Sequence, residues 1–261
     1  MARWLVHGLI PSGSSVVLMG EIHSGKAWLA EALALSVASG RDFLDTFRVE
    51  QQHVILIDED SGTGSFKRRF ERLGRGLDVD LGTLPLECYS RCGFLLYDDE
   101  RRRWLRDLIK KQRGTPLVII DSLERIMGGH QLGEGVPSPL SDFCHELRDA
   151  GGTMLVVHQT GVRRPANVED WDVRKEAQGF TVVIECFDLG LALFRTPTAA
   201  TQFVAKPIVR ESPVTVARPF TIALQEDPQL TWARLAVVED LTELRGRRRR
   251  DLLPQVVEQK D

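Results

Sequence analysis

The residues best suited to chemistry lie in one short stretch, Gly20-Glu21-Ile22-His23-Ser24-Gly25-Lys26-Ala27. Its glycines and lysine have the spacing G-x-x-x-x-G-K, which is typical of a phosphate-binding loop. Glycines let the backbone curl so that successive amides point inward, and lysine adds a full positive charge for the β- and γ-phosphates. We therefore predict a nucleotide-binding loop whose binding residues are Gly20, Ser24, Gly25, Lys26 and Ala27.

The last position of the loop departs from the usual pattern. It ordinarily holds serine or threonine, whose hydroxyl coordinates magnesium, but here it is Ala27. Because a methyl group cannot ligate a metal, either water takes this position with weaker magnesium binding or hydrolysis is lost. The competing interpretation is a glycine-bounded turn that binds nothing.

Three further candidates stand at the ends of apolar runs. Glu59 follows residues 53–57, Asp121 ends residues 116–121, and Gln159 ends residues 153–159. Ligands of open parallel sheets bind beyond the carboxyl ends of the strands. Phosphoryl transfer needs a magnesium-anchoring carboxylate, a group that activates water and a sensor of the terminal phosphate. The sequence predicts these roles for Asp121, Glu59 and Gln159, in that order.

Two of these assignments have close rivals in the sequence. Asp58 and Asp60 flank Glu59, so which of the three carboxylates points toward the ligand is left open. His158 precedes Gln159, and either residue could be an ordinary strand-end hydrogen bonder rather than a phosphate sensor.

The apolar runs alternate with helix-forming segments over the first 160 residues, which indicates βαβ crossovers and an α/β fold with a parallel sheet. Strands are expected at residues 15–19, 53–57, 116–121 and 153–159, with one or two short strands within residues 84–96, and helices at residues 26–39, 66–73, 98–112 and 140–149. Residues 128–139 and 161–178 are expected to be loops.

Beyond residue 179 the rhythm changes, because strand-like runs follow one another without intervening helices. They lie at residues 180–186, 190–194, 202–209, 219–224 and 230–237 and predict antiparallel strands added to the edge of the parallel sheet. We expect one domain over residues 1–240 and a basic, flexible tail over residues 241–261.

The composition excludes several classes of protein. A chain of 261 residues with 43% hydrophobic content can bury a large core, and its net charge of −3 gives no global attraction to nucleic acid. No apolar run reaches the length of a membrane span. The cysteines at 88, 92, 144 and 186 have no metal-ligand spacing, so we expect free thiols in a soluble cytoplasmic protein.

These motifs together resemble the RecA-like ATPases, and among them the RepA-type hexameric helicases of plasmids and the related AAA ATPases. The resemblance covers about residues 4–224. It is carried by the loop and by Gly8-Leu9-Ile10-Pro11, Gly40-Arg41-Asp42-Phe43-Leu44, Ile57-Asp58-Glu59-Asp60 with Arg68, Arg69 and Leu73, Val118-Ile119-Ile120-Asp121 and His158-Gln159-Thr160-Gly161.

The resemblance implies a RecA-like fold, with helices on both faces of a parallel sheet, that binds ATP and magnesium between the subunits of a homo-oligomeric ring. It places Lys26 on phosphate, Glu59 beside the attacking water, Asp121 on magnesium and Gln159 beside the γ-phosphate. Arg210 lies where such proteins often place a basic residue that reaches into a neighbour's site. The chain departs from the plasmid helicases at Ala27 and in having His158-Gln159 instead of a histidine pair.

RecA-like rings hold nucleic acid with the loops that follow the third and fourth strands. The loop after the fourth strand, residues 161–178, offers positive charge for phosphates and one aromatic ring for stacking. Nearby acidic residues cancel part of this positive charge. The candidate contacts to single-stranded DNA are Arg163, Arg164, Trp171, Arg174 and Lys175. A solvated loop and a binding site in the arginine run at residues 247–250 are the alternatives.

Three functions fit this sequence. The first is an ATP-dependent motor or loader that acts on DNA as a helicase or recombination-type protein. The second is a hydrolysis-deficient assembly or regulatory subunit, as Ala27 suggests. The third is a P-loop enzyme on a small substrate, which ranks last because no second basic cluster near the loop marks a site for an acceptor phosphate.

Overall fold

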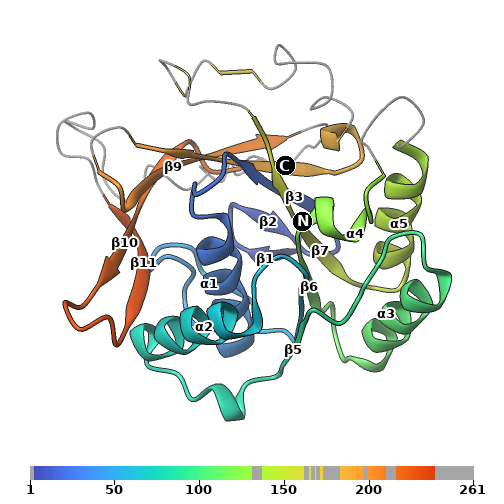
Figure 1. Ribbon diagram of the computed structural model, residues 1–261, viewed down its shortest axis with the longest axis horizontal. Coiled ribbons are helices and arrows are strands. Elements are labelled where there is room, and N and C mark those ends of the chain that lie inside the picture. Colours follow the sequence, from blue (N-terminus) through green and yellow to red (C-terminus); the bar gives the residue numbers. More distant parts are fainter. Residues whose placement is uncertain are drawn as a thin grey trace, which may run out of the picture.

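The computed structural model describes residues 3–130, 137–161, 165, 168, 171–172, 183–196, 199–209 and 216–238 (Figure 1). Within these residues, nine strands form one sheet in the order β11-β10-β9-β8-β3-β7-β6-β4-β5. The strands are β3 (Ser15–Gly20), β4 (Val54–Asp58), β5 (Leu86–Ser90), β6 (Leu117–Asp121), β7 (Thr153–Gln159), β8 (Leu189–Arg195), β9 (Gln202–Val209), β10 (Phe220–Glu226) and β11 (Ala233–Val238).

The helices are α1 (Lys26–Ser39), α2 (Thr63–Leu77), α3 (Asp99–Lys111), α4 (Leu123–Ile126) and α5 (Pro137–Asp149), with a 3₁₀ turn at Leu81–Thr83. Strands β1 (Trp4–Val6) and β2 (Ile10–Pro11) pair with each other in a separate small sheet. No helix in the described part of the chain is long and apolar enough to cross a membrane.

Strands β3 to β8 run parallel, and β9, β10 and β11 continue the sheet antiparallel. The predicted α/β fold, with a parallel sheet and added antiparallel C-terminal strands, is therefore confirmed. The register sets Gly20 opposite Gln159 and Asp58 opposite Asp121. The carboxyl ends of β3, β4, β6 and β7 therefore lie together at one edge of the sheet.

Strand β6 shows why these sequences form a buried parallel sheet. Its residues Leu117 and Ile119 pack on the face covered by α1 and α2, whereas Val118 and Ile120 pack on the face covered by α3 and α5. Figure 1 shows these two helix pairs on opposite sides of the strands. Because both faces of the strand are covered, an unbroken apolar run is favoured over an alternating one.

Helix α1 is buried on most of its surface, as its nearly continuous apolar sequence predicts. It ends at Gly40, whose φ of +74° is the left-handed conformation that glycine adopts most easily at a helix C-terminus. Helix α2 packs in contrast through one apolar side that includes Phe66, Phe70 and Leu73.

Two predictions for the C-terminal half are wrong. Residues 183–185 form a helical turn rather than part of a strand, because Val183 and Ile184 are buried on the α3/α5 side and their carbonyls accept turn hydrogen bonds. The next strand, β8, pairs parallel with β3 instead of starting the antiparallel series. The predicted boundary between residues 1–240 and the tail at 241–261 lies outside the described residues.

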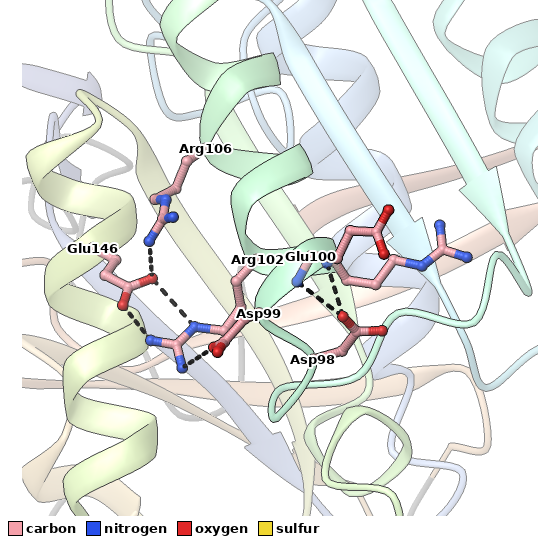
Figure 2. Close-up of polar contacts among 7 residues, drawn as sticks. Asp98, Asp99, Glu100, Arg102, Arg106 and Glu146 are labelled. Carbon is pink, nitrogen blue, oxygen red and sulfur yellow. Dashed lines mark hydrogen bonds and ion pairs between the residues drawn. The ribbon is translucent and has the colours of Figure 1, made fainter.

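Helices α3 and α5 are joined by a cluster of charges on the second face of the sheet (Figure 2). Arg102 and Arg106 of α3 both pair with Glu146 of α5, and the Arg106 Nη1–Glu146 Oε2 distance is 2.9 Å. Asp98 begins α3 by accepting hydrogen bonds from the backbone N–H groups of Glu100 and Arg101. One half-buried carboxylate therefore neutralises two guanidinium groups between the helices.

We predict that Glu146→Gln lowers the free energy of unfolding by about 1–2 kcal/mol, between the usual values for exposed and for buried ion pairs. The substitution leaves Arg102 and Arg106 together without an ionised partner on α5. Urea unfolding measures the change, and Glu71→Gln, which alters an exposed pair with Lys67 on α2, is the matched control. Equal effects of the two substitutions would contradict the structural role of the cluster.

Candidate active site

The loop between β3 and α1 has the backbone that the glycine pattern predicts. Gly25 adopts a φ of +86°, which L side chains rarely adopt, and it precedes the first residue of α1. A Cβ atom on Gly20 would lie 2.5 Å from the carbonyl oxygen of Leu193 and 2.6 Å from Ser24 Oγ. The loop is therefore held close to β8, and neither glycine has a tolerated replacement.

The side chain of Lys26 lies folded across this loop. Its ammonium group donates hydrogen bonds to the carbonyl oxygens of Gly20 at 2.9 Å and of Glu21 at 2.6 Å. Burial lowers the pKa of Lys26, while the negative charges of Asp121 and Glu124 act in the opposite direction. These contacts keep a positive charge at the mouth of the loop.

A cavity of about 430 Å³ lies over the loop and is open to solvent. One part of its lining is polar and comes from the ends of the parallel strands and the helices that follow them. Another part is apolar and includes residues of the C-terminal strands. The lining residues are Ile22, His23, Ser24, Gly25, Lys26, Ala27, Trp28, Asp60, Ser61, Arg69, Asp121, Ser122, Glu124, Val157, Gln159, Ala200, Phe203 and Leu224.

The structure brings Asp121 to this cavity as the sequence predicts. Its burial, together with the nearby negative charges of Asp58 and Asp60, raises its pKa to about 7, although Arg69 and Lys26 oppose the shift. Asp58 lies beside it on β4, is 2% exposed, and accepts a hydrogen bond from the Ser61 amide. The site therefore holds an excess of carboxylates, which favours a cation.

Arg69 of α2 also lines the cavity, and its position is fixed from behind. Its guanidinium donates to Glu31 Oε1 at 2.6 Å and to Ser61 Oγ at 2.7 Å. Glu31 lies inside the apolar helix α1, where burial raises its pKa to about 8 against the opposing charge of Arg69. Sequence reasoning did not find this pair, although an acidic residue within an apolar helix was the available signal.

Glu124 is a second residue that the sequence analysis missed. Its carboxylate accepts a hydrogen bond from the Gln159 amide at 2.7 Å and contacts His158 Nδ1 at 2.5 Å. Burial favours the neutral form of Glu124, but the contact with His158 and hydrogen bonds from the Glu124 backbone and the Ser122 side chain together lower its pKa. The available signal was its position three residues after Asp121. Gln159 lies in the cavity, as predicted, with Glu124 beside its backbone.

Glu59 is not among the residues that line the cavity, which corrects its expected position beside the attacking water. Its carboxylate accepts hydrogen bonds from the Phe94 amide at 2.8 Å and from Cys92 Sγ at 3.2 Å. These donors lie in the loop after β5 and draw the side chain away. Its neighbour Asp60 lines the cavity and pairs with Arg125 at 2.7 Å.

Trp171 is likewise not placed as predicted. It is 7% exposed, and its ring packs edge-to-face against Phe194 at a centroid distance of 5.0 Å. Lys206 lies over the same ring and donates to the Trp171 carbonyl. Because the ring belongs to the core, it offers no stacking surface for a base. The other predicted DNA contacts, and the predicted trans residue, lie outside the described residues: Arg163, Arg164, Arg174, Lys175 and Arg210.

The residues present fit the phosphates of a nucleotide. The Oγ atom of Ser24 is buried and has no hydrogen-bond partner, and the loop around it has no space for added Cβ atoms. Among the described residues, no group of three or more His, Cys, Asp or Glu side chains could hold a metal ion unaided. Magnesium, which typically binds through one or two carboxylates plus phosphates, fits Asp121 with a bound nucleotide.

Comparison with known protein families agrees with this geometry. A family model of the AAA domain matches residues 1–165, which include the loop and the strands from β3 to β7. No curated protein matches the chain. The matched region includes Lys26, Asp121 and Gln159 but ends before the C-terminal strands that supply part of the apolar lining of the cavity.

The pKa of Asp121 predicts how metal-free stability depends on pH. Between its ordinary value of about 4 and its folded value of about 7, the folded state holds a proton that the unfolded chain releases. Stability therefore falls as pH rises through this window. Asp121→Asn removes the contribution, so its stability relative to the parent should increase from pH 4 to pH 7 in urea unfolding.

Asp149→Asn, which changes an exposed carboxylate at the end of α5, is the matched control and should leave the pH profile of the parent unchanged. Glu31 contributes a slope of the same sign in all three proteins. Parallel profiles for the parent and Asp121→Asn would show that the folded state does not retain a proton on Asp121.

Proposed function

The chain belongs to the AAA domain family, and on that premise we propose that it binds magnesium-ATP over the Gly20–Ala27 loop and hydrolyses it slowly. The observation that carries this proposal is the single cavity in which Lys26, Asp121 and Gln159 meet above the loop. These residues come from segments far apart in the sequence. A glycine-bounded turn that binds no ligand would not explain why their side chains meet in one cavity.

Different residues of the chain would bind the phosphates and hold the metal. Lys26 exchanges its two carbonyl partners for phosphate oxygens, and the loop amides and the N-terminus of α1 add further positive potential. Asp121 is the residue that would hold magnesium, which when bound neutralises charge on the phosphates. Arg69, anchored by Glu31, supplies a second fixed positive charge in the cavity.

Slow turnover follows from Ala27, which lies in the cavity without a hydroxyl to offer a metal. Binding depends on Lys26 and the amides, which are intact. Transfer depends on tight placement of the metal, and loss of one such electrostatic contact costs about 10²–10³ in rate. Glu59 acts as a base in this proposal only after its carboxylate leaves the Phe94 amide.

We predict that Ala27→Thr changes the affinity for magnesium-ATP by less than about fivefold but raises the turnover rate by at least about tenfold, because the hydroxyl restores a metal ligand. Calorimetry and a coupled phosphate-release assay measure the two effects. Lys26→Ala, which removes the charge at the phosphates, should abolish binding and serves as the negative control.

Three outcomes are informative here. Brisk hydrolysis by the parent with no gain from Ala27→Thr contradicts slow turnover and favours an active motor. Tight magnesium-ATP binding by Ala27→Thr with no turnover favours a nucleotide-binding assembly or regulatory subunit. Equal ATP affinity of the parent and Lys26→Ala, or no affinity in either, contradicts the site itself.

We also propose single-stranded DNA as a partner of a homo-oligomeric ring or filament, on the model of RepA-type helicases and loaders. This proposal is supported by the sequence, in which several basic residues follow β7, the strand whose last residue lines the cavity. Arg163, Arg164, Arg174 and Lys175 are the proposed contacts. Arg210 is the proposed residue that reaches the neighbour's site.

DNA binding of this kind should weaken steeply with salt, since each phosphate contact releases counterions. Replacing Arg163, Arg164, Arg174 and Lys175 with glutamate should abolish binding of a labelled oligonucleotide in sedimentation experiments, which also report the mass of the complex. Charge reversal at the four exposed residues Arg103, Lys110, Lys111 and Arg113, in and just after α3, is the matched control. Unchanged affinity and salt slope in the loop variant would exclude this loop, and a complex with one copy of the chain would exclude the ring.

A further inference from the structure

The apolar part of the cavity includes residues from beyond the family match. Phe203 of β9 and Leu224 of β10 face the loop together with Ala200, and Trp28 of α1 completes the wall. Phe203 lies so close that a Cβ atom on Gly25 would be 2.8 Å from its ring. This part of the cavity offers aromatic and aliphatic surface within the same space as the phosphate loop.

The indole ring of Trp28 is held in place from outside the cavity. The guanidinium carbon of Arg72 on α2 lies over the ring, 5.5 Å from its centroid, which is the geometry of a cation–π contact. Glu226 of β10 holds Arg72 in turn through an ion pair that is mostly buried. Three elements therefore fix a partly exposed aromatic ring two residues after Lys26.

The cavity is lined by both charged and apolar side chains. Lys26 and Arg69 lie close enough to Asp121 for their charges to act on its carboxylate, and these three residues suit the terminal phosphates and magnesium. A nucleotide bound there extends its sugar and base away from these charges. The surface that remains to receive the base is the apolar wall that includes Trp28 and Phe203.

We propose that Trp28 is the stacking platform for a purine base of the nucleotide in this cavity, with Phe203 and Leu224 forming the wall beside it. This inference rests on the proposed nucleotide binding and adds the residues that receive the base. Stacking on an aromatic side chain contributes about tenfold or more to affinity. A ring already fixed by Arg72 loses little freedom when the base arrives.

The test compares ligands with and without a base on the full chain. Calorimetry measures magnesium-ATP, magnesium-CTP and magnesium-tripolyphosphate binding to the parent and to Trp28→Leu. We expect Trp28→Leu to weaken ATP binding at least about tenfold and CTP binding less, because the smaller ring stacks over less area, while tripolyphosphate binds equally well. Trp232→Leu, which removes a partly exposed tryptophan away from the cavity, should match the parent.

The outcomes separate this inference from the proposed function. If the parent binds neither ATP nor tripolyphosphate, the phosphate site itself is wrong. If Trp28→Leu binds ATP within twofold of the parent, or loses tripolyphosphate as severely as ATP, Trp28 does not receive the base. A parent that prefers CTP to ATP also overturns the purine assignment.

A second measurement avoids dependence on how well Trp28→Leu folds. ATP should quench the tryptophan fluorescence of the parent, whereas tripolyphosphate should not, because only a stacked base contacts the indole. The quench should disappear in Trp28→Phe, which keeps an aromatic ring and should keep ATP affinity within about threefold. A quench that persists in Trp28→Phe, or is absent from an ATP-saturated parent, overturns the proposal.

Discussion

The structure depends on the parallel register of the central strands, because that register concentrates charged groups at one buried edge. Strand β3 lies between β7 and β8, so the phosphate loop that follows it is flanked by Gln159 on one side and by the backbone of Leu193 on the other. Two strands further along, Asp58 and Asp121 stand opposite each other. A shift of one residue in the pairing of β4 with β6 would place one of these two carboxylates on the opposite face of the sheet.

Burying several carboxylates close together costs free energy unless positive charge lies nearby, and a helix supplies that charge. Arg69 enters from α2 and is held by Glu31 from α1, so a buried ion pair ties the two helices on one face to the site. The raised pKa values of Asp121 and Glu31 show that the balance is incomplete, because burial outweighs the nearby positive charge. A bound cation stabilises a site whose buried carboxylates are not fully balanced by positive charge, and a magnesium-nucleotide site requires this property.

The parts of the site that could be predicted from sequence are those that local pattern determines. Gly25 and Lys26 lie in a motif with a recognisable strand before it and a recognisable helix after it. Asp121 and Gln159 end apolar runs that βαβ crossovers make parallel to the first strand. The orientation of Glu59 could not be predicted, since it depends on an amide of the loop after β5, thirty-five residues later. Trp171 was mistaken for a surface ring because its partner Phe194 lies on a distant strand.

The C-terminal strands supply apolar residues of the cavity that no sequence motif indicates. They extend the parallel sheet beyond β8, and β11 lies against α2, where Gly76 approaches the carbonyl of Ala233 too closely for a Cβ atom. Through Glu226 and Arg72 the same strands fix the ring of Trp28 on the phosphate-loop helix. The region outside the family match is therefore mechanically joined to the region within it.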